Sequence, residues 1–286
     1  MLFYYIIKSS LINNFVVYYN LNLYNAHMSK KKEDKLTLVN FRDLGGLEVA
    51  NGKKIKHGLI YRTATFEPET QTDFDYIKKM NLNTVIDLRS PSEIAETPDV
   101  LPETVKHIEA VVYNSDNYKH LVPTNKTKYT ILFMSKKKVN SLYELMKDVY
   151  AYMPYSKDAY SNIFKCMDEH QTFAFHCMAG KDRTGIGALL IELTFGRTYE
   201  QCLEQYLYSD VVRKEFNEYM EWKTNLAPAR KHIKDFAKYC LYVHKELFDQ
   251  AYNAIFSKYN TFQDFLKDVY GITPEQIKDW EEFYLE

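Results

Sequence analysis

The residues most capable of chemistry lie together at positions 176–185, which read HCMAGKDRTG. Cys177 is followed six positions later by Arg183, so one short loop carries both a nucleophile and a guanidinium. An apolar run at 172–175 precedes this loop and an apolar helical pattern at 186–195 follows it, which predicts a buried strand and a buried helix on either side. A loop so placed can form an anion cradle of backbone N–H groups at a helix N-terminus. The residues predicted to bind the anion are Met178, Ala179, Gly180, Lys181, Asp182 and Arg183.

The same cradle would prepare Cys177 as a nucleophile. Inward-facing amides, a guanidinium and a helix N-terminus all favour negative charge, and cysteines in such settings have pKa values of about 3.5 to 7.5. A thiolate there can attack phosphorus and form a cysteinyl-phosphate that water then hydrolyses. Gly180 would let the backbone turn, and Arg183 would hold two phosphate oxygens. This chemistry requires no metal and no other cofactor.

Five neighbouring residues are candidates for supporting roles. Asp182 could protonate the leaving oxygen and later activate water, or it could only orient the loop, and the spacing leaves both interpretations open. Thr184 could hydrogen-bond the thiolate or be an ordinary hydroxyl at a helix start. His176 is expected to brace the loop rather than act as a base. Asp87 and Arg89 lie where a parallel strand would end, so they either support the loop or form a structural salt bridge.

Short β-like runs alternate with helical patterns from Leu36 onward, which predicts an α/β fold. Strands are expected at 83–87, 105–113 and 172–175, the last of them central in the sheet. Helices are expected at 70–80, 139–152, 157–170, 186–195, 203–222 and 229–259, with a final pair around Gly271. The C-terminal part is therefore predicted to be helical.

The chain is expected to hold one catalytic domain, residues 28–286. Residues 1–27 contain two apolar runs that are too short to span a membrane, and no clean secretory signal is present. We interpret 1–27 as a dispensable extension, with Met28 as the true start, against the alternative of a weakly membrane-associating segment. Residues 114–154 are polar and rich in Lys and Tyr, so they could form a lid over the site or a long surface connection.

Composition narrows the class of protein. The chain has 286 residues, 46% hydrophobic and 26% charged, with a formal net charge of −1, which is typical of a globular domain. A protein without a global basic field is not expected to bind nucleic acid, so any anion site must be local. The four scattered cysteines suggest neither a disulfide framework nor a zinc site, which favours a cytoplasmic location without excluding secretion. The oligomeric state is not predicted.

The loop contains the Cys-x5-Arg signature of the cysteine-dependent phosphatases. With Lys181 and Asp182 before the arginine, it resembles the bacterial tyrosine and phosphoinositide phosphatases similar to the mycobacterial protein tyrosine phosphatase B. Three further blocks follow the family in the same order, namely NFRDLGG at 40–46, LIYRTA at 59–64, and VIDLRS at 85–90 with Glu93 after it. The resemblance covers the chain from about Val39 to its C-terminus.

This resemblance implies a cysteine-phosphatase-like fold, with a central, mostly parallel sheet flanked by helices. It implies a protein-tyrosine phosphatase in which Cys177 is the nucleophile, Arg183 the phosphate clamp and Asp182 the general acid. In this family Lys181 is associated with activity on phosphoinositides as well as phosphoproteins. The implied substrates are therefore phosphotyrosine proteins or phosphoinositides, with dual specificity toward phosphoserine and phosphothreonine. Met178 stands where animal inositol-lipid phosphatases with a similar loop carry lysine, which argues against a lipid preference.

Two alternative functions remain open. A binding module would hold a phospho-ligand without releasing phosphate, although Cys177, Asp182 and Arg183 together argue against it. Another thiol enzyme, of the arsenate reductase or sulfurtransferase type, would use the same anion loop for different chemistry. Such enzymes need a resolving thiol or a different loop, and neither Cys166 nor Cys202 has an evident pairing with Cys177.

Overall fold

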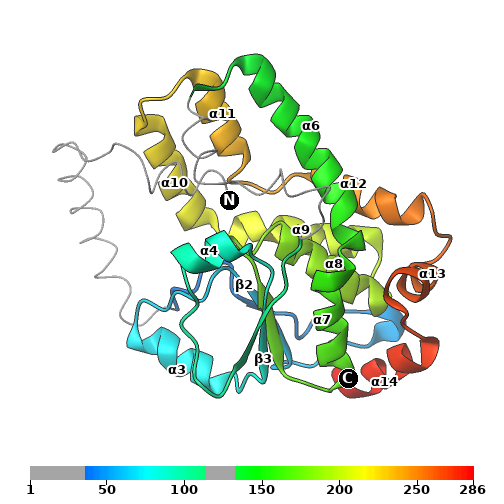
Figure 1. Ribbon diagram of the computed structural model, residues 1–286. Coiled ribbons are helices and arrows are strands. Elements are labelled where there is room, and N and C mark those ends of the chain that lie inside the picture. The colour runs from blue at the N-terminus through cyan, green and yellow to red at the C-terminus, as the bar shows by residue number, and fades with distance from the viewer. Residues whose placement is uncertain (1–35, 114–132) are drawn as a thin grey trace.

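The computed structural model describes residues 36–113 and 133–286, which form a central sheet surrounded by helices (Figure 1). The strands are β1 (Arg42–Asp43), β2 (Ile60–Thr63), β3 (Thr84–Asp87), β4 (Lys106–Glu109) and β5 (Phe173–His176). Their order is β1-β2-β5-β3-β4, and every neighbouring pair is parallel except β1 with β2. The predicted α/β fold with a mostly parallel sheet is confirmed.

The expected central position of the strand before the loop is also confirmed, because β5 lies between β2 and β3. All four of its residues are buried, and side chains alternate between the two faces of the sheet. Phe173 and Phe175 pack in the main core with residues of the helices on their side, whereas Ala174 packs with Ile77 on the other side. Burial on both faces explains why this strand reads as a continuous apolar run.

The helices occupy most of the remaining chain, and the predicted helical C-terminal part is confirmed. The helices before β5 are α3 (Gln71–Lys79), α4 (Pro91–Glu96), α6 (Lys136–Tyr152) and α7 (Lys157–Asp168). Those after β5 are α8 (Arg183–Thr194), α9 (Tyr199–Val212), α10 (Lys214–Leu226), α11 (Lys231–Tyr239), α12 (Lys245–Phe256), α13 (Phe262–Phe265) and α14 (Pro274–Tyr284). Shorter turns are η1 (Ala50–Gly52), η4 (Met153–Tyr155) and the π-helical η5 (Leu266–Tyr270).

Helix α8 follows the loop directly in the chain and supports it. All of its residues are buried, as the nearly all-apolar pattern at 186–195 predicted. It ends at Thr194, and Gly196 beyond it has a φ of 76° that lets the N–H of Arg197 reach back to the carbonyl of Glu192 at 3.0 Å. A helix enclosed in this way gives the preceding loop a fixed foundation.

Two predicted long helices are each divided, so the expectations for 203–222 and 229–259 were wrong. The first divides at Arg213 into α9 and α10, and the guanidinium of Arg213 donates to the carbonyl of Ala179 at 3.0 Å. The second divides after Cys240 into α11 and α12, and the N–H of Val243 in the connection donates to the carboxylate of Asp210 at 3.1 Å. Tertiary contacts of this kind leave no signal in helical periodicity. The strand expected at 105–113 is also shorter, because β4 ends at Glu109.

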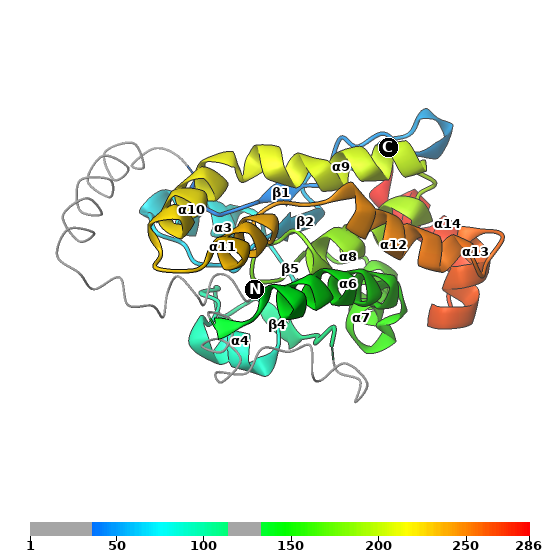
Figure 2. The same ribbon diagram turned by 90° about the horizontal axis from the view of Figure 1, so that it is seen from above.

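The proposed extension, residues 1–27, and residues 114–132 of the proposed insertion lie outside the described residues. The rest of the insertion contains α6, which begins after Ser135, whose side chain accepts a hydrogen bond from the N–H of Lys138. Helix α6 contacts α11 and α12, and Figure 2 shows it running beside them. It therefore places its residues over the C-terminal end of the sheet.

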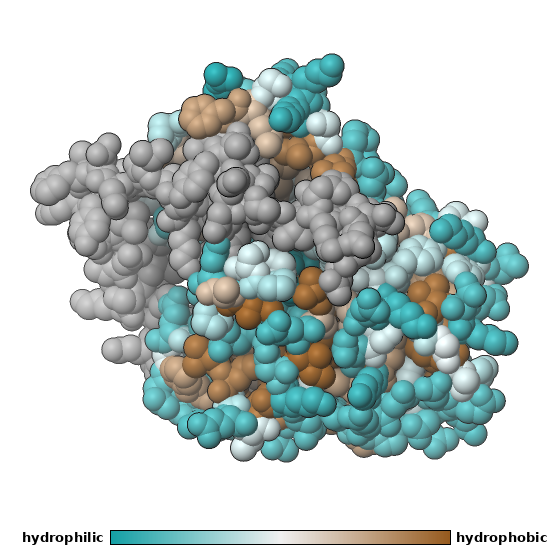
Figure 3. All heavy atoms as spheres, viewed as in Figure 1, coloured by the Kyte–Doolittle hydropathy of each residue, from teal (hydrophilic) through white to brown (hydrophobic). Residues whose placement is uncertain are grey.

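Where the face shown in Figure 3 is not grey, its hydrophobic residues form separate patches among hydrophilic ones. No helix within 36–113 or 133–286 is long and apolar enough to cross a membrane.

Candidate active site

A cavity of about 180 Å³ lies beyond the C-terminal end of β5, where the loop begins, and the predicted reactive residues line it together. Its walls are Tyr113, Leu142, Leu145, Met146, Val149, Tyr150, Met153, Cys177, Met178, Ala179, Lys181, Asp182, Arg183, Phe236 and Cys240. One side is the loop itself, and the opposite side is formed mainly by apolar residues of α6. Concave sites with mostly apolar walls and a few convergent polar groups are typical of ligand sites.

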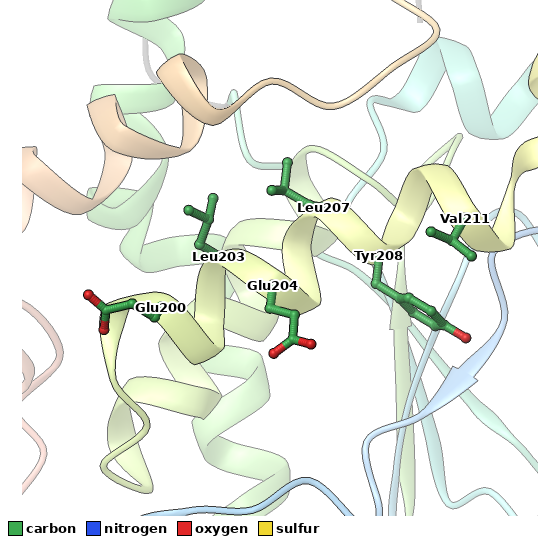
Figure 4. Close-up of a pocket in the computed structure, with 6 residues that line it drawn as sticks. All are labelled: Glu200, Leu203, Glu204, Leu207, Tyr208 and Val211. Carbon is green, nitrogen blue, oxygen red and sulfur yellow. The ribbon is translucent and has the colours of Figure 1, made fainter.

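A second hollow lies along the outer face of α9 (Figure 4). Its lining residues are Glu200, Leu203, Glu204, Leu207, Tyr208 and Val211. These residues follow one another at helical spacing, and none of them is an activated nucleophile. The cavity at Cys177 is therefore the candidate active site.

The loop is held by hydrogen bonds to its carbonyl groups. Asn40 donates to the carbonyls of Ala179 and Gly180 at 3.2 and 2.7 Å. Arg62 donates to the Gly180 carbonyl at 2.8 Å, and Arg213 donates to the Ala179 carbonyl at 3.0 Å. Because a trans peptide places its N–H opposite the preceding C=O, fixing these carbonyls turns the following N–H groups away from Asn40, Arg62 and Arg213. Within the described part of the chain, no N–H of residues 178–182 donates to a protein acceptor, so these donors are available to an anion.

Gly180 allows the loop to approach the backbone of β2 closely. Its φ is 65°, and a Cβ atom there would lie 2.4 Å from the carbonyl oxygen of Thr63. Any larger residue would therefore be strained and would collide with the backbone of β2. The loop thus lies directly against a strand that neighbours β5.

Cys177 is buried, and yet the pKa of its thiol is lowered. Burial by itself raises the pKa of its thiol, but the charge of Arg183 and the hydroxyl and N–H of Thr184 bring that pKa below its ordinary value. In two other cysteines burial dominates: it raises the pKa of Cys166 to about 12 and the pKa of Cys240 to about 11. The lowered pKa of Cys177 therefore depends on its particular neighbours, Arg183 and Thr184.

Arg183 is fixed by a two-point ion pair with Glu93. The two terminal nitrogens of its guanidinium each donate to one carboxylate oxygen of Glu93 at 2.9 Å, and one also donates to the carbonyl of Leu88 at 3.1 Å. Glu93 also accepts hydrogen bonds from the N–H and hydroxyl of Ser90, both at 2.9 Å. Burial raises the pKa of Glu93, but the charge of Arg183 outweighs it and lowers that pKa to about 2.

Asp182 lines the same cavity at the N-cap of α8. Its Oδ1 accepts hydrogen bonds from the hydroxyl of Tyr150 and, at 3.2 Å, from Lys181 Nζ. Burial raises the pKa of this carboxyl, but the charge of Lys181 and the Tyr150 hydroxyl lower it, with a net decrease. Lys181 also donates to the carbonyl of Tyr242 at 2.9 Å, so its ammonium is held on the protein side.

His176 contacts the backbone of the loop and a carboxylate behind it. Its Nδ1 lies 3.2 Å from the carbonyl oxygen of Cys177, which requires that this nitrogen donate. Its Nε2 lies 3.0 Å from a carboxylate oxygen of Asp99. Asp87 and Arg89 form a buried salt bridge at 2.7 Å, and Arg89 also contacts Asp99 at 2.9 Å. Through Asp99, this salt bridge also contacts His176, which lies directly before Cys177.

The same cluster is the group of side chains that could hold a metal. Ligand atoms of Asp87, Asp99, His107 and His176 all lie within 4.8 Å of one another. The guanidinium of Arg89 already donates to both carboxylates, and the two carboxylates raise the pKa of His107 to about 9. The negative charges of the cluster are therefore paired with cationic side chains.

Comparison with known proteins places the chain in a family. Residues 35–286 match the model of a family described as the tyrosine phosphatase family. The chain belongs to the tyrosine phosphatase family. It is 28% identical over 183 residues to the protein named "Putative tyrosine-protein phosphatase" of Cupriavidus necator. That match covers 64% of this chain and 64% of the length of the relative.

In this member of the tyrosine phosphatase family, six of the predicted loop residues line one cavity: Cys177, Met178, Ala179, Lys181, Asp182 and Arg183. Sequence reasoning missed three residues that contact them, namely Asn40, Tyr150 and Arg213, and it favoured a structural role for a fourth, Arg62. Asn40 and Arg62 lie in two of the sequence blocks shared with the phosphatases, which was the available signal. Nothing in the spacing of Tyr150 or Arg213 indicates that they reach the loop.

Alkylation should distinguish the two thiols of the cavity. Because the pKa of Cys177 is lowered and that of Cys240 is raised to about 11, Cys177 should react with iodoacetamide at lower pH than Cys240 does. Mass spectrometry of peptides from protein labelled between pH 5 and 9 measures both rates. Parallel pH dependence of the two cysteines would contradict the thiolate at Cys177.

The ion pair between Glu93 and Arg183 should contribute to stability. Glu93→Gln leaves a buried guanidinium uncompensated, so the free energy of unfolding should fall by roughly 3 kcal/mol at pH 7. The folded pKa of Glu93 is about 2 and its ordinary value is 4.5, so the contribution is present above pH 4.5 and is lost as the pH falls through 2.

Urea denaturation of both proteins between pH 7 and pH 2 measures this difference. Glu144→Gln is the matched control, because Glu144 pairs with Lys147 on the surface and its side chain is 72% exposed. A Glu93 variant as stable as this control would refute the buried pair as a stabilising interaction.

Proposed function

We propose that this protein is a protein-tyrosine phosphatase that hydrolyses phosphate monoesters through a cysteinyl-phosphate intermediate. The observation that carries the proposal is that buried Cys177, Asp182 and Arg183 line one cavity, in a loop whose carbonyls are bound by Asn40, Arg62 and Arg213. The lowered pKa of the Cys177 thiol agrees with it. A nucleophile, an anion cradle and a carboxyl group share one small space. Family membership supports the same reaction class.

The first step forms a bond between the Cys177 sulfur and phosphorus and breaks the ester P–O bond. The N–H groups of the loop and the Arg183 guanidinium hold the three non-bridging oxygens, where negative charge must be accommodated in the transition state. Asp182 donates its proton to the departing phenolic oxygen. The products are a tyrosine hydroxyl and a phosphorylated cysteine.

The second step returns the enzyme to its starting state. Asp182, now ionised, accepts a proton from a water molecule that attacks phosphorus. The P–S bond breaks, inorganic phosphate leaves, and Cys177 is again a thiolate. The low pKa of Asp182 in the free protein suits this role as a base, and the charge of a bound phosphate raises that pKa for the first step.

The cavity walls favour an aromatic substrate. Leu142, Met146, Val149 and Phe236 form an apolar surface opposite the loop, which suits the ring of phosphotyrosine. Among the described lining residues the cationic side chains are Lys181 and Arg183, which is few for a polyphosphorylated inositol headgroup. We therefore place phosphotyrosine first and phosphoserine, phosphothreonine and phosphoinositides below it. Phosphate release from all four classes under one set of conditions ranks them.

The alternative of a thiol enzyme with a resolving cysteine has one candidate in the cavity, Cys240. Burial raises the pKa of its thiol to about 11, so it is a poor thiolate at neutral pH. This favours hydrolysis by water over thiol exchange.

Cys177→Ser should abolish release of phosphate from a phosphotyrosine peptide and should retain binding of inorganic phosphate. The hydroxyl does not ionise as the thiol does, whereas the N–H groups and Arg183 stay in place. Phosphate release and calorimetric titration with phosphate measure the two properties. Turnover equal to that of the unmodified protein would refute the nucleophile, and a wild-type protein that binds phosphopeptides without releasing phosphate would favour the binding module.

Asp182→Asn should slow kcat/KM for phosphotyrosine peptides by about 10² to 10⁴, the usual contribution of positioned proton transfer. Substrates with acidic phenols as leaving groups should be slowed far less, because their departing oxygen needs no proton. A series of aryl phosphates with different leaving-group pKa values measures this dependence. Equal slowing across the series would assign Asp182 a purely structural role.

A further inference from the structure

The general-acid candidate is held by a chain of buried hydroxyl groups that come from other helices. Tyr150, near the end of α6, donates its hydroxyl proton to Asp182 Oδ1. The hydroxyl of Tyr206, on α9, lies 2.9 Å from that of Tyr150. Both tyrosines are only 2% exposed, so water does not compete freely for these bonds.

The direction of the chain follows from counting protons. Tyr150 has one hydroxyl proton, which goes to Asp182, so its oxygen must accept the proton of Tyr206. Two helices, α6 through Tyr150 and α9 through Tyr206, thus converge on one carboxylate at the start of α8.

The two oxygens of Asp182 are not equivalent. Oδ1 accepts from both Tyr150 and Lys181, whereas within the described residues no hydrogen bond reaches Oδ2. Donors to one oxygen favour the proton on the other and fix the rotation of the carboxyl group. Oδ2 is therefore the oxygen able to exchange a proton with a substrate in the cavity.

We propose that Tyr150, held by Tyr206, is a positioning residue that aims Oδ2 of Asp182 at the leaving group. The proposal rests on the phosphatase function argued above and adds a residue that the loop motif does not contain. Helix α6 then has two tasks, since it lines the cavity with apolar side chains and orients the acid from its last turn. The other titratable or charged groups facing Asp182 are Tyr113, Cys177, Arg213 and Cys240.

Tyr150→Phe removes one hydroxyl and keeps the buried ring. Loss of a donor to the ionised carboxylate raises the pKa of Asp182, so the alkaline limb of the kcat/KM profile should move to higher pH. At the optimum, kcat/KM for a phosphotyrosine peptide should fall roughly tenfold, because the acid is less well aimed. For p-nitrophenyl phosphate, whose leaving group needs little protonation, it should stay within about twofold.

Tyr206→Phe should shift the limb in the same direction by less, since it loses only the support of Tyr150. The matched control is Tyr155→Phe, which loses a hydroxyl bond to the carbonyl of Ala254 shortly after α6 and should leave the limb in place. An alkaline limb that does not move in Tyr150→Phe, or that moves equally in Tyr155→Phe, overturns the proposal.

A second measurement separates this inference from the phosphatase function. Carboxyl ¹³C NMR gives the titration of Asp182 with no turnover, in the Cys177→Ser background with and without Tyr150→Phe. A higher Asp182 pKa in the double variant supports the positioning role, and an unchanged one refutes it. Absence of turnover in the wild-type protein would instead refute the proposed function and leave this titration valid.

Discussion

The structure depends on the hydrogen bonds that hold the loop carbonyls against the protein. Asn40, Arg62 and Arg213 together bind the carbonyls of Ala179 and Gly180, and a trans peptide then turns the next N–H groups away from these three side chains. Without these bonds the backbone could satisfy itself internally, and the donors would be lost to an anion. A buried sulfur would then lack the positive field that makes its ionised form favourable.

Burial is the second constraint, and it acts in both directions. A loop between a central strand and a fully buried helix lies in a low-dielectric region, where unpaired charge is costly and paired charge is strong. The charge of Arg183 is paired with Glu93, and the carboxylate of Asp182 is paired with Lys181 and accepts a hydrogen bond from Tyr150. Every charge that the proposed reaction uses is thus supported by a partner outside the reacting atoms.

The sequence predicted those features that depend on residues close together in the chain. The loop from His176 to Thr184 is continuous in the chain, so its composition revealed the candidate site, and the alternation of strands and helices predicted the fold. The supports were not predictable in the same way, because Arg213 and Tyr150 reach the loop only after helices far apart in the chain have packed together. The divisions of the two long helices were missed for the same reason.

The most direct measurement is a crystal structure of the protein soaked with tungstate, a tetrahedral oxyanion of phosphate-like geometry. The account predicts the ion in the cavity, with its oxygens on the N–H groups of residues 178–183 and on the Arg183 guanidinium, and with the Cys177 sulfur facing the metal atom of the anion. Tungstate bound elsewhere, or a loop whose N–H groups point away from the cavity, would contradict it.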